Sequence, residues 1–190
     1  GIRDRSPSRG LGDVYKRQGL TYEKSDYLTP IDYGHVCVNY WKSSFSDSFP
    51  PPSSINDLLD PSYASLLVVQ NPETSSPGLA FLLASISHFG SNWKNFWKLL
   101  TQNGVSVTND WESSYYGEFV AGGGKKSLVV SYASSPIAEL IYSDPPVEVS
   151  PTAIIEDSCF EQIEYAGILK NSKKRTEAEL LIDFLLSRRF

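Results

Sequence analysis

The sequence has 190 residues, of which 41% are hydrophobic and 21% charged. This composition is typical of a folded globular protein and excludes collagen, coiled coils and bulk disorder. A formal net charge of −5 argues against a nucleic-acid binder that tracks phosphates, and no apolar run approaches the roughly 18 residues of a membrane-spanning helix.

The first 18 residues differ in character from the rest of the chain. They are basic, show no apolar periodicity, and lack the apolar core of about 7 to 15 residues that a secretory signal needs. They resemble translated sequencing-adapter sequence. We therefore expect residues 1–18 to be non-native, with a native basic tail as the alternative.

The rest of the chain alternates between strand and helix patterns, read from the spacing of apolar residues and from Pro, Gly and Ser punctuation. In chain order, the patterns predict a strand at Tyr33–Tyr40, a short helix at Ile55–Leu59, a strand at Ser65–Gln70, helices at Leu79–Phe89 and Ser91–Gly104, a strand at Val105–Thr108, a helix at Glu112–Val120, a Gly-rich turn at Ala121–Lys126, a strand at Leu128–Tyr132, a helix at Ile137–Tyr142, an extended stretch at Val147–Ile155 and a helix at Thr176–Ser187.

This alternation predicts an α/β protein with a largely parallel sheet. Such sheets bind ligands at the carboxyl ends of their strands. The turns that follow three of the predicted strands are therefore the candidate site, namely Asn71–Gly78, Asn109–Trp111 and Ala133–Pro136.

Hydroxyl groups are concentrated in two of these turns. Thr74, Ser75 and Ser76 precede a helix, where hydroxyls and free backbone amides can bind an anion, although simple N-capping explains them equally. Tyr132 ends a strand before a second Ser-Pro turn. Trp111 in the third turn can stack on an aromatic or cationic ligand, whereas core packing is the better interpretation for Trp93 and Trp97.

Other chemistry finds little support. Ala121–Ser127 resembles a phosphate-binding loop but precedes a strand, so we interpret it as a turn. The two histidines form no recognisable triad, and no group near Ser75, Trp111 or Tyr132 offers a general base. The tandem Tyr115-Tyr116 is predicted to lie on a helix, with Tyr115 on its apolar face.

The cysteines do not define a site. Cys37 and Cys159 match no metal-ligand spacing, and their wide separation does not indicate a redox pair, so their state is left open.

Four strings, taken together and in this order, resemble the thiamine-binding proteins of bacterial ABC transporters. They are Asp32-Tyr33-Gly34, the stretch Leu66–Leu79, Asp110-Trp111-Glu112 with Tyr116–Phe119, and Ser131–Pro136. The resemblance runs from about residue 32 to residue 190. These proteins belong to the larger group of periplasmic solute-binding proteins that also includes ferric-ion binders.

The resemblance implies an α/β, periplasmic-binding-protein-like fold in which two lobes, joined by crossing hinge strands, close over a ligand. Residues 19–43 would be the end of the first lobe and a hinge strand, 44–142 the second lobe, and 143–190 an incomplete return toward the first lobe. The chain would thus be truncated at both ends and consist mostly of the second lobe.

The resemblance also implies the ligand contacts. In this family the Thr-Ser-x-Pro-Gly turn contacts the phosphate end of the ligand, which carries over to Thr74, Ser75 and Ser76. Trp111 and Tyr132 would line the same site. Ser135, in the second hydroxyl-rich turn, completes the predicted ligand-binding set.

Two positions depart from the family pattern. Some members have a second contacting Tyr where this chain has Ala138, so that contact is absent or replaced. The ferric-binding branch typically has a tandem Tyr where this chain has Tyr132-Ala133, which argues against iron.

The expected function is the solute-binding component of an ABC importer for thiamine or its phosphates. Its partners would be the ligand and a membrane permease, with no cofactor, no metal and no nucleic acid, and the protein would be a monomer located in the periplasm or outside the cell, with a lipid anchor as one option. The alternatives are a binding protein for another small organic ion or for ferric iron, and an enzyme on the same scaffold.

Overall fold

A computed structural model describes residues 27–187, so the segment 1–18 interpreted as non-native lies outside the described part. The chain divides into two compact units, Gly34–Glu161 and a smaller one that contains residues 27–33 and 162–187. The lobe boundaries expected from the resemblance stay a prediction.

In chain order the elements are β1 (Leu28–Trp41), η1 (Lys42–Ser44), η2 (Asp57–Leu59), α2 (Pro61–Ala64), β2 (Leu67–Gln70), α3 (Ser76–Phe89), η3 (Gly90–Asn92), α4 (Trp93–Gln102), β3 (Ser106–Thr108), η4 (Ser113–Glu118), η5 (Val120–Gly122), β4 (Leu128–Tyr132), α5 (Ser135–Tyr142), β5 (Thr152–Gly167) and α6 (Arg175–Leu185).

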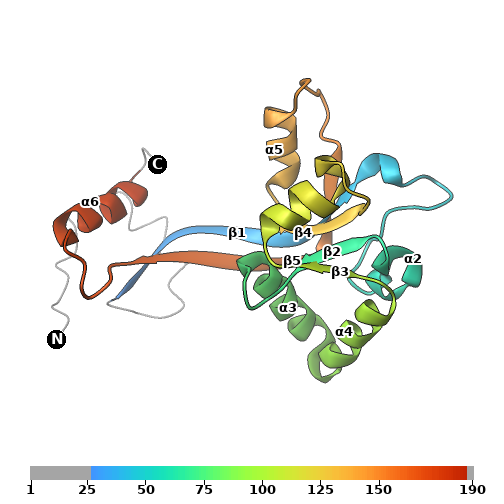
Figure 1. Ribbon diagram of the computed structural model, residues 1–190, viewed down its shortest axis with the longest axis horizontal. Helices are drawn as coiled ribbons and strands as arrows, with labels where there is room; N and C mark the ends of the chain where they lie inside the picture. Colours follow the sequence, from blue (N-terminus) through green and yellow to red (C-terminus); the bar gives the residue numbers. More distant parts are fainter. Residues whose placement is uncertain (1–26, 188–190) are drawn as a thin grey trace. The chain divides into compact units, whose positions relative to one another are not determined.

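The five strands form one sheet in the order β3-β2-β4-β1-β5. β2 pairs in parallel with both β3 and β4, whereas β1 runs antiparallel to β4. The predicted α/β architecture is confirmed, with the difference that the sheet is mixed. In the larger unit, α3 and α4 lie on one side of the sheet and η4 and α5 on the other (Figure 1).

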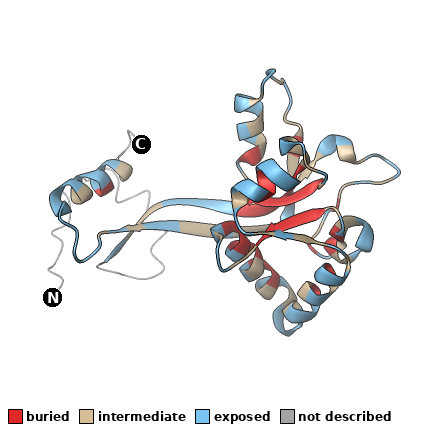
Figure 2. Cartoon of the chain, viewed as in Figure 1, coloured by how far each residue is buried: buried red, intermediate tan, exposed pale blue. Residues whose placement is uncertain are grey.

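The central strands are buried on both faces, as Figure 2 shows by their colour. Leu67 and Val69 of β2 face the cluster formed with α3 and α4, whereas Val68 faces a second cluster around η4. This period-two division is the geometry of any strand, and it explains why β2 and β4 read as continuous apolar runs. Each face therefore carries its own hydrophobic core.

The predicted elements between residues 33 and 142 are confirmed in type, with one exception. The segment expected as a regular helix at Glu112–Val120 is a π-helix over Ser113–Glu118, and Phe119 already has an extended backbone. Tyr115 and Phe119 still pack into the same cluster. Tyr115 therefore lies in the core, as expected, although the segment is not α-helical.

The structure also contains a strand that the sequence patterns did not show. β5 runs over Thr152–Gly167, where only its first residues were expected to be extended. Its burial follows no regular alternation, and it carries several Glu and Asp residues, so period-two reasoning finds no signal there.

Cys37 of β1 and Cys159 of β5 form a disulfide bond. A second link lies beside it, because the backbone amide of Val38 donates to Ser158 Oγ at 2.8 Å in a buried position. Neither link has a local sequence signal, since the two cysteines are 122 residues apart. The pair joins the central part of the sheet to its edge strand.

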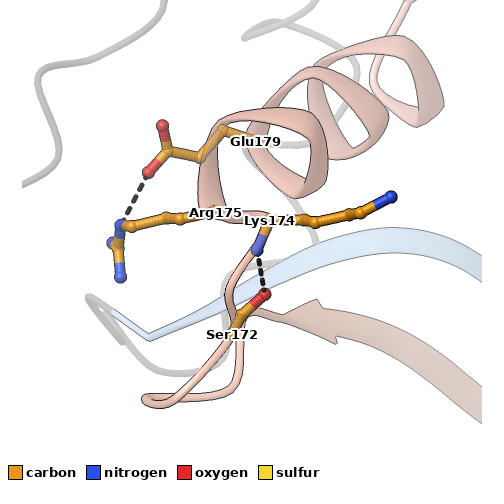
Figure 3. A network of polar contacts seen from close by, with 4 residues as sticks. All are labelled: Ser172, Lys174, Arg175 and Glu179. Carbon is orange, nitrogen blue, oxygen red and sulfur yellow. Dashed lines mark hydrogen bonds and ion pairs between the residues drawn. The ribbon is translucent and has the colours of Figure 1, made fainter.

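The smaller unit contains α6, whose start is held by local polar contacts (Figure 3). The Lys174 amide donates to Ser172 Oγ at 3.3 Å, and Arg175 Nε lies 3.0 Å from Glu179 Oε1 one helical turn later. Both side chains of this ion pair are well exposed, so it contributes less than about 1 kcal/mol.

Replacing both cysteines by alanine is expected to lower the free energy of unfolding by about 2–4 kcal/mol, because the unfolded chain loses a covalent restraint between distant segments. Urea denaturation of the wild type and the Cys37→Ala/Cys159→Ala variant measures this. Reductant should move the wild-type midpoint toward that of the variant and leave the variant unchanged. A wild-type midpoint that stays the same with reductant would contradict the Cys37–Cys159 disulfide.

Candidate functional site

The carboxyl ends of β2, β3 and β4 meet at one edge of the sheet, as expected for neighbouring parallel strands. Two hydrogen bonds join the turns that follow β2 and β3. The backbone N–H of Asn71 donates to the Thr108 carbonyl at 2.8 Å, and Thr74 Oγ1 donates to the backbone carbonyl of Asn109 at 2.5 Å. The predicted turns are therefore brought together in space.

The first hydroxyl-rich turn leaves two of its hydroxyls without partners. Ser75 is the N-cap residue of α3, but its side chain makes no capping hydrogen bond, and Ser76 is exposed. Within residues 27–187 neither hydroxyl has a hydrogen-bond partner, whereas the Thr74 hydroxyl is occupied by Asn109. The first amides of α3 also have no partner inside the helix. The N-capping explanation thus does not account for the serines.

Gly78 lets this turn approach the end of β2. A Cβ atom at this position would lie 2.5 Å from the Gln70 carbonyl oxygen, which is too close for any other residue. The Thr-Ser-Ser-Pro-Gly string therefore has a packing reason for its glycine, and α3 begins directly beside the strand end.

Trp111 is held in place by a chain of buried hydroxyls. Its indole Nε1 donates to Ser131 Oγ at 2.9 Å, and Ser131 Oγ lies 2.8 Å from Ser135 Oγ. Ser131 is fully buried and Ser135 nearly so. The Ser135 hydroxyl therefore supports the Ser131–Trp111 pair, and its predicted role as a ligand contact stays a prediction.

Trp111 is the centre of an aromatic cluster. Its ring stacks on Tyr115 at a centroid distance of 4.9 Å, meets Tyr116 edge-on at 5.4 Å, and lies 6.2 Å from the ring of Tyr132. Trp111 and Tyr132, predicted from separate strands, are thus adjacent. The sequence expectation of a helix surface holds for Tyr116, which is 61% exposed, whereas Tyr115 is buried.

A pocket of about 170 Å³ opens beside this cluster. Its walls include the rings of Trp111, Tyr115, Tyr116 and Tyr142, together with Ser135 and Glu139 of α5. The expectation that no group able to act as a general base lies near Trp111 is wrong, because Glu139 of α5 lines the same pocket as Trp111. Its position three residues beyond Pro136 on a short helix is the signal that could have identified it.

Glu139 is held by Tyr115. The Tyr115 hydroxyl donates to Glu139 Oε1 at 2.7 Å. Burial is the main cause that raises the pKa of the Tyr115 phenol far above its ordinary value near 10, and the hydrogen bond to Glu139 and its charge add to this effect. The phenol stays protonated at neutral pH and keeps donating to the carboxylate.

The other features weighed from the sequence are explained by the fold. Lys126 in the Gly-rich turn donates to the carbonyl of Ser65 at 2.6 Å, which fits a structural turn and not a phosphate loop. Trp97 packs against the core as expected, whereas the expectation of core packing is wrong for Trp93, which is half-buried outside both core clusters. Residues 27–187 contain no group of three or more His, Cys, Asp or Glu placed to bind a metal, and no helix there is long and apolar enough to cross a membrane.

Comparison with known proteins gives a consistent result. The sequence profile of a family described as bacterial extracellular solute-binding proteins matches residues 8–190. The thiamine-binding periplasmic protein of Salmonella typhimurium is 32% identical over 88% of this chain and 49% of its own length. The Escherichia coli protein of the same name is 29% identical over 87% of this chain and 48% of its own.

A solved structure gives the same picture. A periplasmic thiamin binding protein superposes with a TM-score of 0.73 at 29% identity, over 87% of this chain and 49% of that one. This chain therefore spans about half the length of the relatives that it matches.

Replacing Ser131 by alanine is expected to loosen Trp111 and to destabilise the fold by about 1–3 kcal/mol, because the variant leaves the partly buried indole N–H and the buried Ser135 hydroxyl without their partner. Amide and indole hydrogen exchange by NMR should show faster exchange at Trp111 Nε1. The exposed Ser134→Ala is the matched control. Unchanged indole exchange in Ser131→Ala would contradict this role.

Tyr115 also makes stability depend on pH. Above about pH 10 the unfolded chain loses the Tyr115 proton while the folded chain retains it, so the free energy of unfolding falls as pH rises, by up to about 1.4 kcal/mol per pH unit. Urea denaturation between about pH 8 and 11 should give a shallower decline in Tyr115→Phe than in the wild type. Parallel curves for the two proteins would refute this.

Proposed function

Because the chain belongs to the family of bacterial extracellular solute-binding proteins, we propose that it is part of the solute-binding component of an ABC importer for thiamine or its phosphates. The ligand would lie at the shared carboxyl edge of β2, β3 and β4. The proposed ligand-binding residues are Thr74, Ser75, Ser76, Trp111, Tyr132 and Ser135.

One observation carries this proposal more than any other. The structure brings Trp111 and Tyr132 to adjacent positions at the strand ends, and the turn with the Ser75 and Ser76 hydroxyls is tied to the same edge through Thr74. These are the segments whose residue strings resemble the thiamine-binding family. A ligand that combines a flat ring with a phosphate needs a site with two parts, an aromatic surface and a helix start that can bind an anion.

The two halves would divide the ligand between them. Phosphate oxygens accept hydrogen bonds well from hydroxyls and from free amides at the start of a helix, where the helix dipole also favours negative charge. The cationic thiazolium ring is attracted to the faces of aromatic rings. The Ser75–Ser76 turn suits the first task and Trp111 with Tyr132 the second.

The rest of the proposal follows from the family. The protein would bind its ligand between two lobes, without a cofactor, and present it to a permease in the membrane, acting as a monomer. The curated relatives are named periplasmic, so we propose a periplasmic or extracellular location, with the means of anchoring left to experiment.

Two alternatives have specific tests. A binding protein for another small organic ion or for ferric iron would share the fold, and ligand competition distinguishes it. An enzyme on this scaffold gains one argument from Glu139, which lies in the pocket beside Trp111. The relatives, however, are named as binding proteins, and turnover of the bound ligand would be the observation in favour of an enzyme.

Titration of the 190-residue chain with thiamine and thiamine phosphates, followed by tryptophan fluorescence and by calorimetry, tests the proposal. We expect saturable binding that weakens at least about tenfold in Trp111→Ala and in Tyr132→Ala, since each variant removes an aromatic anchor. Ser75→Ala should weaken the binding of thiamine phosphates more than the binding of thiamine.

Trp93→Ala is the matched control, because Trp93 lies on α4, outside the site. It should change the fluorescence intensity but not the affinity. Ferric citrate and simple anions serve as competing ligands. Saturation by one of these, with no response to thiamine, would move the assignment to another solute.

A further inference from the structure

The pocket beside Trp111 combines aromatic walls with a single negative charge. Four aromatic residues, Trp111, Tyr115, Tyr116 and Tyr142, are among those that line it, and Glu139 is the one charged residue in this lining. Trp111 and Tyr115 stack with only 22° between their planes, while Tyr116 stands at 82° to Trp111. Aromatic residues and one carboxylate therefore line the same pocket.

The carboxylate of Glu139 is oriented but not neutralised. Oε1 accepts a hydrogen bond from Tyr115, whereas Oε2 has no hydrogen-bond partner within residues 27–187. The single ion pair found in that part of the chain joins Arg175 and Glu179, so no cationic side chain balances Glu139 there. A half-buried charge without a counter-ion, beside an open pocket, favours a cation from outside the chain.

The surroundings explain why Glu139 keeps this position. Tyr115 is 3% exposed and is fixed by its stacking on Trp111, so its hydroxyl has little freedom to turn away. Burial holds the Tyr115 phenol in its protonated, donating form. The carboxylate is thereby held in the lining of the pocket, with its second oxygen available to a ligand.

Residue 138 gives this pocket its room. Ala138 lines the pocket and is exposed. A larger side chain here would occupy part of the same space. The small residue and the neighbouring carboxylate therefore act together, one by leaving volume and the other by supplying charge.

We propose that this pocket takes the positively charged ring of the ligand and that Glu139 is the residue that selects a flat heteroaromatic cation over a neutral ring of the same shape. The inference rests on the proposed function, since it assigns one part of that ligand to one subsite. Glu139 lies on α5 and is not among the predicted ligand contacts, so it adds a specificity determinant to that set.

The test compares two ligands that differ in charge and not in shape. Thiamine carries a thiazolium cation, and deazathiamine carries a neutral thiophene ring in its place. Calorimetric titration of the wild type, Glu139→Gln and Glu148→Gln measures both affinities. Glutamine keeps an oxygen that accepts from Tyr115, and Glu148 is an exposed carboxylate outside the pocket, so its variant makes the same change of net charge.

We expect Glu139→Gln to weaken thiamine binding about tenfold and to change deazathiamine binding by less than about twofold, because only the charged ring loses an attractive partner. Glu148→Gln should change neither. Tyr115→Phe should give a smaller loss that is again confined to thiamine, since the stack remains while the carboxylate is released. Thermal denaturation checks that each variant is folded.

The outcomes separate the two proposals. Equal losses for both ligands in Glu139→Gln would assign the residue a structural role and overturn the selectivity inference, and so would unchanged thiamine affinity. A wild-type protein that binds neither ligand would overturn the proposed function and this subsite with it. Thiamine binding with no preference over deazathiamine would keep the function and reject the role of Glu139.

Discussion

Burial of β2 and β4 on both faces is the constraint on which the rest of the structure depends. Each strand presents alternate apolar side chains to two separate cores, so helices must cover both sides of the sheet. Because β2, β3 and β4 run parallel, their carboxyl ends lie at the same end of the sheet. The three turns that carry Thr74, Trp111 and Tyr132 are therefore neighbours for a reason that has nothing to do with a ligand.

A chain of buried polar groups turns that edge into a defined site. The indole of Trp111 is oriented by Ser131, and Ser131 by Ser135. Buried hydroxyls without partners are costly, so each member holds the next. Trp111 in turn positions Tyr115, whose hydroxyl orients Glu139. Hydrophobic burial of the strands and hydrogen bonding at their ends thus cooperate to fix one aromatic surface with one carboxylate.

Local patterns were sufficient for the elements whose burial is regular. The strands β2 and β4 and the helices α3 and α4 have short apolar runs or a helical stripe with clear stop signals, so their positions follow from residue spacing. Residues 113–118 and β5 differ for physical reasons. In the π turn, Tyr115 packs against Phe119, and Gly122 approaches the Tyr116 backbone too closely for a Cβ atom. β5 is defined by its neighbour β1, to which it is bonded through Cys159.

The sequence by itself determined the α/β class and the turns that contain Thr74, Trp111 and Tyr132, because strands, helix starts and turns have local patterns. The family resemblance came from four residue strings and not from periodicity. Only the tertiary structure decided that Cys37 pairs with Cys159, that Ser131 holds Trp111, and that Glu139 faces Tyr115. These contacts join residues 122, 20 and 24 positions apart. No local spacing encodes such distances, since they are set by how the helices pack on the two faces of the sheet.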